Sequence, residues 1–197
     1  MAGREEEALE EAKNNDRLWE EVGNPGIEVT RYQASGEGMV HLGRFEDAER
    51  YFRRGVEIFD SLGETGFNST MTALHASTLC RLGRFEEAEA SAARSRELSA
   101  EDDFASQVAW RRAQAWVLSA RGEHEKALRL LDEAAALVAP TDYLDFQAET
   151  GAVRGLVLRA AGRTEEARAA FEDSLARYER KGAIPAARRV REELETL

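Results

Sequence analysis

Five glycines recur at nearly equal intervals along the chain, and their spacing constrains the fold more than any other feature of the sequence. They are separated by 40, 40, 39 and 40 residues, and an alanine follows each of them five positions later. A small residue that lets two helices approach closely precedes the last four glycines by seven positions. Self-similarity at a period of about 20–50 residues is typical of a solenoid. The glycines are Gly3, Gly43, Gly83, Gly122 and Gly162, and the small residues are Gly36, Ala76, Ala115 and Gly155.

Each unit of about 40 residues contains two stretches of helical periodicity that meet at the glycine. After Gly43, the apolar residues Phe45, Ala48 and Phe52 recur at intervals of three or four, which is the spacing of one helix face. A similar stripe that includes Met39 precedes the glycine. The glycine is a natural stop for the first helix, because it adopts a positive φ without a Cβ clash. Two helices in every unit predict an all-α fold.

The composition limits the classes of partner. The chain has 38 acidic and 27 basic residues, which give a formal net charge of −11. Such a surface repels phosphate backbones and anionic lipids, so we expect the protein to bind neither nucleic acid nor membranes. The longest apolar runs are too short to span a bilayer, and the single cysteine, Cys80, is typical of a reducing cytosol. These features predict a cytoplasmic protein.

No set of residues in the sequence predicts catalysis or metal binding. The histidines His41, His75 and His124 fall in different units and have no ligand partner three or four residues away. No nucleophile motif or phosphate-binding loop occurs, so we expect neither an enzyme nor a bound cofactor. Asp102 and Asp103 precede an apolar periodic stretch and are expected to cap a helix.

The recurring pattern resembles the tetratricopeptide repeat. The small residue, the glycine and the alanine carry the resemblance, together with a large apolar residue four positions after the alanine, such as Phe52 or Phe171. The resemblance implies antiparallel helix pairs that stack into a right-handed α-solenoid with a concave groove. The period exceeds the family's usual value of about 34 residues, and we place the extra residues in longer second helices and in loops at residues 23–26, 63–66 and 139–142. The tryptophan of the family is replaced in the four units by Tyr32, Thr72, Arg111 and Gly151.

We predict one domain over residues 1–197, with a capping helix at its C-terminal end. Residues 29–68, 69–107, 108–147 and 148–182 form the four repeats, and residues 183–197 form the cap, with Arg188, Arg189 and Arg191 on its outer face. Residues 4–22 align with a second helix whose first helix is missing, so we expect the chain to start at a cut made through a repeat. This orphan helix is expected to expose Leu9 and Leu18 and to form a homo-oligomer with another copy.

The second half of the chain shows a narrower resemblance. Asp102-Asp103, Trp110-Arg111 and the run Tyr-Glu-Arg-Lys-Gly at residues 178–182 are similar to the C-terminal repeat regions of large bacterial signalling proteins. Those proteins carry a nucleotide-cyclase-like domain and a regulatory ATPase domain. The resemblance implies a non-catalytic scaffold that binds a protein or peptide segment as the regulatory part of such a protein. A sensor that holds an anionic metabolite, or a purely architectural module that self-associates, are the alternatives.

If the geometry of the tetratricopeptide family applies, the first helix of each pair lines the concave groove. Three arginines and a tryptophan on that face could hold a peptide carboxylate and an apolar anchor, or could simply solvate the surface. The carboxylate clamp of chaperone-binding members is absent, because other residues stand at its lysine and asparagine positions. The expected groove residues are Gln33, Glu37, His41, Thr70, Ser77, Arg81, Arg112, Trp116, Ser119, Glu149 and Arg159.

Overall fold

The computed structural model describes residues 25–197 together with Glu10 and Asn14. Residues 25–197 form nine helices and no strand, so the predicted all-α class is confirmed. None of these helices is both long and apolar enough to cross a membrane. The expected orphan helix at residues 4–22 falls, apart from Glu10 and Asn14, outside the described residues. The helices are α2 (Pro25–His41), α3 (Phe45–Leu62), α4 (Gly66–Arg81), α5 (Phe85–Leu98), α6 (Phe104–Ala120), α7 (His124–Val138), α8 (Leu144–Ala160), α9 (Thr164–Lys181) and α10 (Ile184–Glu195).

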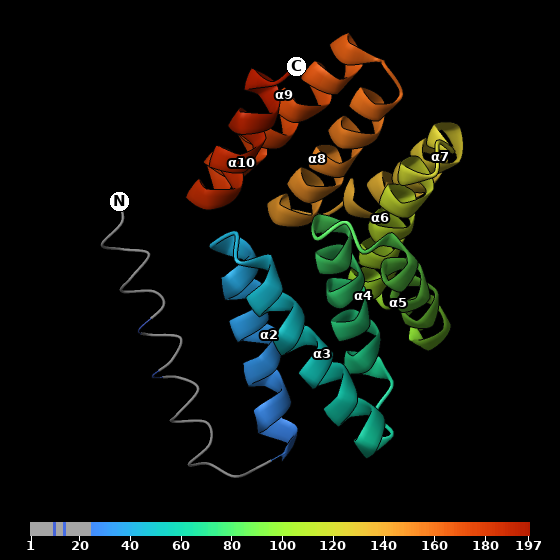
Figure 1. Cartoon of the computed structure of the whole chain (residues 1–197), viewed down its shortest axis with the longest axis vertical. Coiled ribbons are helices and arrows are strands. Elements are labelled where there is room, and N and C mark those ends of the chain that lie inside the picture. Colours follow the sequence, from blue (N-terminus) through green and yellow to red (C-terminus); the bar gives the residue numbers. More distant parts are fainter. Residues whose placement is uncertain (1–9, 11–13, 15–24) are drawn as a thin grey trace.

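The helices form pairs that follow one another around an arc (Figure 1). Helix α2 packs on α3, α4 on α5, α6 on α7 and α8 on α9, while α4, α6 and α8 also contact one another in series. Helix α10 packs against α9 at the end of the arc. Its Arg189 donates a hydrogen bond of 3.0 Å to the backbone carbonyl of His41 at the end of α2. The first and last described helices are therefore in direct contact.

The recurring phrase of the sequence builds the turn inside each helix pair. Gly43, Gly83, Gly122 and Gly162 all adopt a positive φ of 72–80°, as expected for a residue that ends a helix without a Cβ clash. An ion pair between the residue after the glycine and the residue three positions further on spans the start of the next helix. In the third turn the two charges are exchanged. The pairs are Arg44 with Asp47, Arg84 with Glu87, Glu123 with Lys126, and Arg163 with Glu166.

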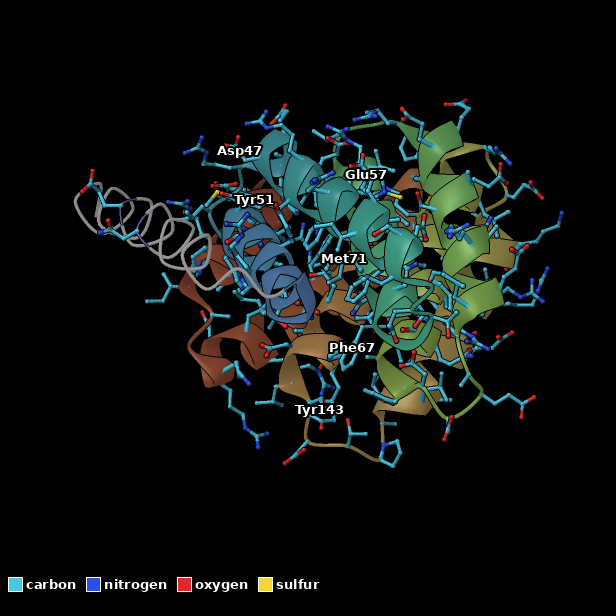
Figure 2. The ribbon with its side chains drawn as sticks, turned by 90° about the horizontal axis from the view of Figure 1, so that it is seen from below. Asp47, Tyr51, Glu57, Phe67, Met71 and Tyr143 are labelled. Carbon is cyan, nitrogen blue, oxygen red and sulfur yellow. The ribbon has the colours of Figure 1, made fainter. Side chains whose placement is uncertain are left out.

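The small residue before each turn is smallest where the side chain opposite it is largest. A Cβ added at Gly36 would lie 2.5 Å from the Phe52 ring, and one at Gly155 would lie 2.5 Å from the Phe171 ring. The two middle units have alanines at this position, which share buried clusters with the smaller residues Ala92 and Leu131. The expected close approach of the two helices is therefore confirmed. Figure 2 shows Met71 in the interior, where it packs against α3.

Candidate binding site

Three arginines from three helices surround one carboxylate where α4, α6, α8, α9 and α10 meet. Oε1 of Glu149 accepts a hydrogen bond from Nη2 of Arg81 at 3.2 Å, and its Oε2 accepts one from the Tyr178 hydroxyl at 2.5 Å. Arg112 and Arg189 act on the same carboxylate electrostatically. We call these five residues the arginine cluster. It contains three guanidinium groups and one carboxylate in a molecule whose net charge is −11.

The surrounding charges fix the protonation states of Glu149 and Tyr178. Burial by itself would raise the pKa of Glu149, but the charges of Arg81 and Arg112 and the Tyr178 hydrogen bond lower it to about 2. Burial and the neighbouring Glu149 carboxylate raise the pKa of Tyr178 well above its usual value of 10.0. At neutral pH, Glu149 is therefore ionised, and Tyr178 keeps the proton that it donates to Glu149.

Arg112 is the member of the arginine cluster whose hydrogen-bonding capacity is unused. Its residue is 7% exposed, and its guanidinium carbon lies 5.4 Å from the centroid of the Phe146 ring. It makes no hydrogen bond or ion pair with any described residue, and its Nε is buried without a partner. Burial lowers the pKa of Arg112 and the charge of Arg81 lowers it further, while Glu149 and Tyr178 oppose this shift. Burying an arginine without a direct hydrogen-bond partner costs stability, and the attraction to Glu149 and the contact with the Phe146 ring offset this cost in part.

Arg81 connects the cluster to two aromatic rings. Its guanidinium carbon lies 4.8 Å from the centroid of the Trp116 ring and 5.9 Å from that of Phe45. A cleft of about 20 Å³ opens beside Arg81, Glu149, Tyr178 and Arg189. A space of this size holds roughly one water molecule.

The structure brings together only part of the predicted groove. Arg81, Arg112, Trp116 and Glu149 meet in and beside the arginine cluster. His41 contributes its backbone carbonyl to the contact with Arg189, while the residue itself is exposed.

The other predicted groove residues lie outside the arginine cluster, and all but Ser77 have side-chain partners of their own. The Gln33 side chain donates to Glu37 at 3.0 Å on α2. Thr70 shares a 2.8 Å hydrogen bond with Ser106 between α4 and α6. Three further residues lie elsewhere: Ser119 is bonded to His124, Arg159 is paired with Glu193 of α10, and Ser77 is half-buried on α4.

Tyr178 and Arg189 were not among the residues predicted from the sequence. Arg188 and Arg191 lie exposed on α10, as expected for its outer face, but Arg189 turns inward, and this part of the prediction was wrong. The signal in the sequence is the spacing of Arg189 to the buried residues Ala186 and Val190, which places all three on one side of the helix.

The surroundings of His75, Cys80 and Asp103 are explained by the packing and capping of the helices. Burial lowers the pKa of His75, whose ring nitrogens lie 3.4 Å from Glu49 and 3.3 Å from Ser91. Burial raises the pKa of Cys80 to about 12, so its thiol is unreactive at neutral pH. Asp103 caps α6 by accepting the Ser106 N–H at 3.2 Å, as predicted. The described residues contain no group of three histidines, cysteines or carboxylates that could hold a metal ion.

The sequence profile of the tetratricopeptide repeat-like domain matches residues 33–196. The chain belongs to the tetratricopeptide repeat-like family. Domains of this family generally mediate protein–protein interaction and are generally not catalytic. A search of curated proteins finds no match to the chain.

Two solved structures show the same fold. BtubC (BKLC) from P. vanneervenii is 15% identical, covers 98% of this chain and 88% of its own, and superposes with a TM-score of 0.55. A variant of a putative kinesin light chain with nearly identical TPR-like repeats, from Podosopora anserina, is 16% identical, covers 92% of this chain and 95% of its own, and has a TM-score of 0.50. At such low identity the likeness concerns the arrangement of helices alone.

Proposed function

We propose that the chain is a non-catalytic scaffold that binds an acidic segment of another protein at the arginine cluster. One observation carries the proposal: Arg112 is buried without a hydrogen bond or ion pair to any described residue. A guanidinium group forms its strongest contacts with carboxylates, to which it can donate two parallel hydrogen bonds. A carboxylate from a partner would supply the contact that Arg112 lacks.

The charge balance of the arginine cluster supports the same proposal. Glu149, its one carboxylate, is already bonded to Arg81 and Tyr178. An added carboxylate that enlarged the cleft would meet Arg81 and Arg189 in its lining, where Glu193 also lies. It would have to reach past the lining to contact Arg112. Trp116 beneath Arg81 offers an apolar surface for a neighbouring side chain of the bound segment.

The test is a selection of random peptides displayed on phage against the folded chain. We expect the selected peptides to be rich in aspartate and glutamate, and Arg112→Met to bind them at least about tenfold more weakly. Arg94→Met is the matched control, because Arg94 is an exposed arginine of α5 that pairs with Asp60. This variant should bind the peptides as tightly as the unaltered chain does. Selected peptides without acidic residues, or equal binding by Arg112→Met, would overturn the proposal.

A small-molecule sensor at the same residues is the alternative. The cleft beside the cluster has room for roughly one water molecule, so a metabolite would have to enlarge it more than a single side-chain carboxylate does. A ligand that binds only the folded form raises the melting temperature. A metabolite panel that raises the melting temperature of the unaltered chain but not of Arg112→Met, with no peptide selected, would favour the sensor.

We also propose that the chain is the C-terminal regulatory part of a larger bacterial signalling protein of the cytoplasm. The motifs shared with such proteins, at Asp102-Asp103, Trp110-Arg111 and residues 178–182, support this proposal. The full reading frame of the gene tests it, since cyclase-like and ATPase domains should be encoded upstream. Pairing of two chains through residues 4–22 stays a prediction, and light scattering at two concentrations tests it.

A further inference from the structure

We propose a second binding site, separate from the arginine cluster, in which a tryptophan side chain of a protein partner enters an open cavity between α7, α8 and α9. The cavity has a volume of about 470 Å³. This lies within the range of roughly 300–1,000 Å³ that is typical of sites for small ligands. Its lining includes Leu131, Ala135 and Val138 of α7, and Thr150 and Gly151 of α8.

The preceding repeat shows what fills such a space. Between α5, α6 and α7, Trp110 is stacked against two arginines, with the guanidinium carbons of Arg111 and Arg96 4.2 and 5.4 Å from the centroid of its ring. Trp110 is 6% exposed and donates its indole N–H to Gln107 at 3.2 Å. The stack links α6 to α5 through Arg96, and Arg111 pairs with Glu133 of α7 at 3.0 Å.

The small residues that line the cavity lie one repeat after the residues of this stack, so they occupy the equivalent positions. The turn glycines give offsets of 39 residues from the second to the third repeat and 40 from the third to the fourth. Applied to the stack, these offsets replace each of its three large side chains by a small one. The equivalent residues are Trp110 and Thr150, Arg111 and Gly151, and Arg96 and Ala135.

The polar residues that surround the stack have equivalents around the cavity. Gln147 is equivalent to Gln107, and its Nε2 donates to the carbonyl of Val138 at the end of α7, as that of Gln107 donates to the carbonyl of Ala100 just after α5. Its Oε1 accepts from Arg177, as that of Gln107 accepts from an arginine and from the indole. Arg177 and Arg154 are about one third exposed at the rim, where a guanidinium can meet the face of an aromatic ring.

The chemistry of the rim favours an aromatic side chain over an anion. Arg154 is paired with Asp132 at 2.6 Å, and Arg177 with Asp173 at 2.8 Å, so both arginine charges are already compensated. A ring can stack on a paired guanidinium without displacing its carboxylate. The site therefore offers an incoming indole the same three contacts that Trp110 has: an apolar helix surface, a guanidinium face and a side-chain amide oxygen.

The experiment is a titration of the ¹⁵N-labelled chain with N-acetyltryptophanamide, followed by NMR, with N-acetylalaninamide as the matched control. We expect shifts of backbone signals that cluster in α7, α8 and α9 around Ala135 and Gly151, and that are absent with the alanine compound. The variant A135R/T150W/G151R rebuilds the stack within the chain and should reduce these shifts at least tenfold. A Cβ at residue 151 would make ordinary contacts of 3.4–3.8 Å with Ser174 and Ala170 of α9, so the backbone tolerates a side chain there at its first atom.

A second variant keeps the test decisive if the rebuilt chain folds poorly. Ala135→Leu changes one half-buried position of the lining, narrows the cavity and should weaken the shifts in the same places. Arg94→Met should leave the shifts unchanged, because Arg94 is exposed on α5 and lies outside the lining of the cavity. Shifts scattered over the surface, shifts of equal size with N-acetylalaninamide, or shifts that survive in both filled variants would overturn the proposal.

Discussion

The turns and the arginine cluster both bring basic side chains against carboxylates, but they differ in how far these side chains are exposed to solvent. At the fourth turn, Arg163 pairs with Glu166 at 2.6 Å while the two side chains remain 37% and 57% exposed. In the cluster, Arg112 is 7% exposed and has no direct partner. The turn pairs are satisfied and repeated, whereas Arg112 of the cluster has no hydrogen bond or ion pair to any described residue. The repeated pairs therefore belong to the fold, and we propose that a partner completes the contacts of Arg112.

The third turn shows that the order of the two charges can be exchanged. There the charges are exchanged, with Glu123 pairing with Lys126, and Gly122 keeps its positive φ of 80°. The sign of each charge is therefore immaterial to the turn, as expected of exposed ion pairs, which contribute little to stability. In the cluster the signs are decisive, because low solvent exposure strengthens each interaction.

The largest expected effect is that of Glu149→Gln, which removes the negative charge of the cluster and preserves its shape. The pKa of Glu149 is lowered to about 2 from 4.5, so its ionisation stabilises the fold by about 3 kcal/mol at neutral pH. We expect the variant to lose most of this free energy of unfolding, as measured by urea denaturation. Glu166→Gln at the fourth turn is the control and should unfold with the unaltered chain. Equal losses in the two variants would contradict the contrast between cluster and turn.

The same contrast predicts a pH dependence. Because the pKa of Glu149 is lower in the folded chain than in the unfolded one, its contribution is full above pH 5 and declines as the pH falls towards 2. The difference in unfolding free energy between the unaltered chain and Glu149→Gln should shrink over this window. A difference that stays constant from pH 6 to pH 3 would show that the effect of the substitution is not electrostatic.

A smaller effect concerns His75. Burial lowers its pKa below 6.5, because the ring is buried as the neutral form. Its contribution to stability is therefore present above pH 6.5 and is lost as the pH falls below it. His75→Gln should flatten the pH dependence of the melting temperature between pH 7 and pH 5, as measured by circular dichroism. An unchanged slope would show that His75 does not titrate in this range.

The smallest expected effect is that of exchanging the charges of a turn pair. The double variant Arg163→Glu/Glu166→Arg reproduces the charge order of the third turn, and its melting temperature should match that of the unaltered chain. Scanning calorimetry of the two chains provides the measurement. A clear loss of stability would mean that the order of charges matters at this turn.

The fold could be predicted from the sequence because its determinants are local and repeated. The turn glycines and the matched pairs Gly36–Phe52 and Gly155–Phe171 are visible as spacings. The ends of the helices are harder to predict. Helix α2 begins at Pro25, inside the loop that we expected at residues 23–26. Proline is well suited to the first position of a helix, and this preference outweighed the turn signal.

The candidate site could be predicted only in part. Arg81, Arg112 and Trp116 were placed on one face because the repeat fixes which side of each first helix points inward. Arg189 was not, because its contact with His41 joins residues 148 positions apart. That contact depends on the curvature of the whole arc, which sums small rotations from every repeat. The spacing of residues within one repeat therefore does not predict the contact between Arg189 and His41.

The most direct test of the account is the free energy of unfolding of Arg112→Met, measured by urea denaturation at neutral pH. Replacing this buried cation by an apolar side chain of similar length removes the cost of burying it, but it also removes part of the attraction that lowers the pKa of Glu149. If Arg112 serves a partner, these two effects offset each other, and we expect the free energy of unfolding to change by less than about 1 kcal/mol while acidic peptides bind at least about tenfold more weakly. A loss of about 3 kcal/mol or more, which is what removing one partner of a buried pair costs, would show that Arg112 supports the fold and would contradict its role in binding.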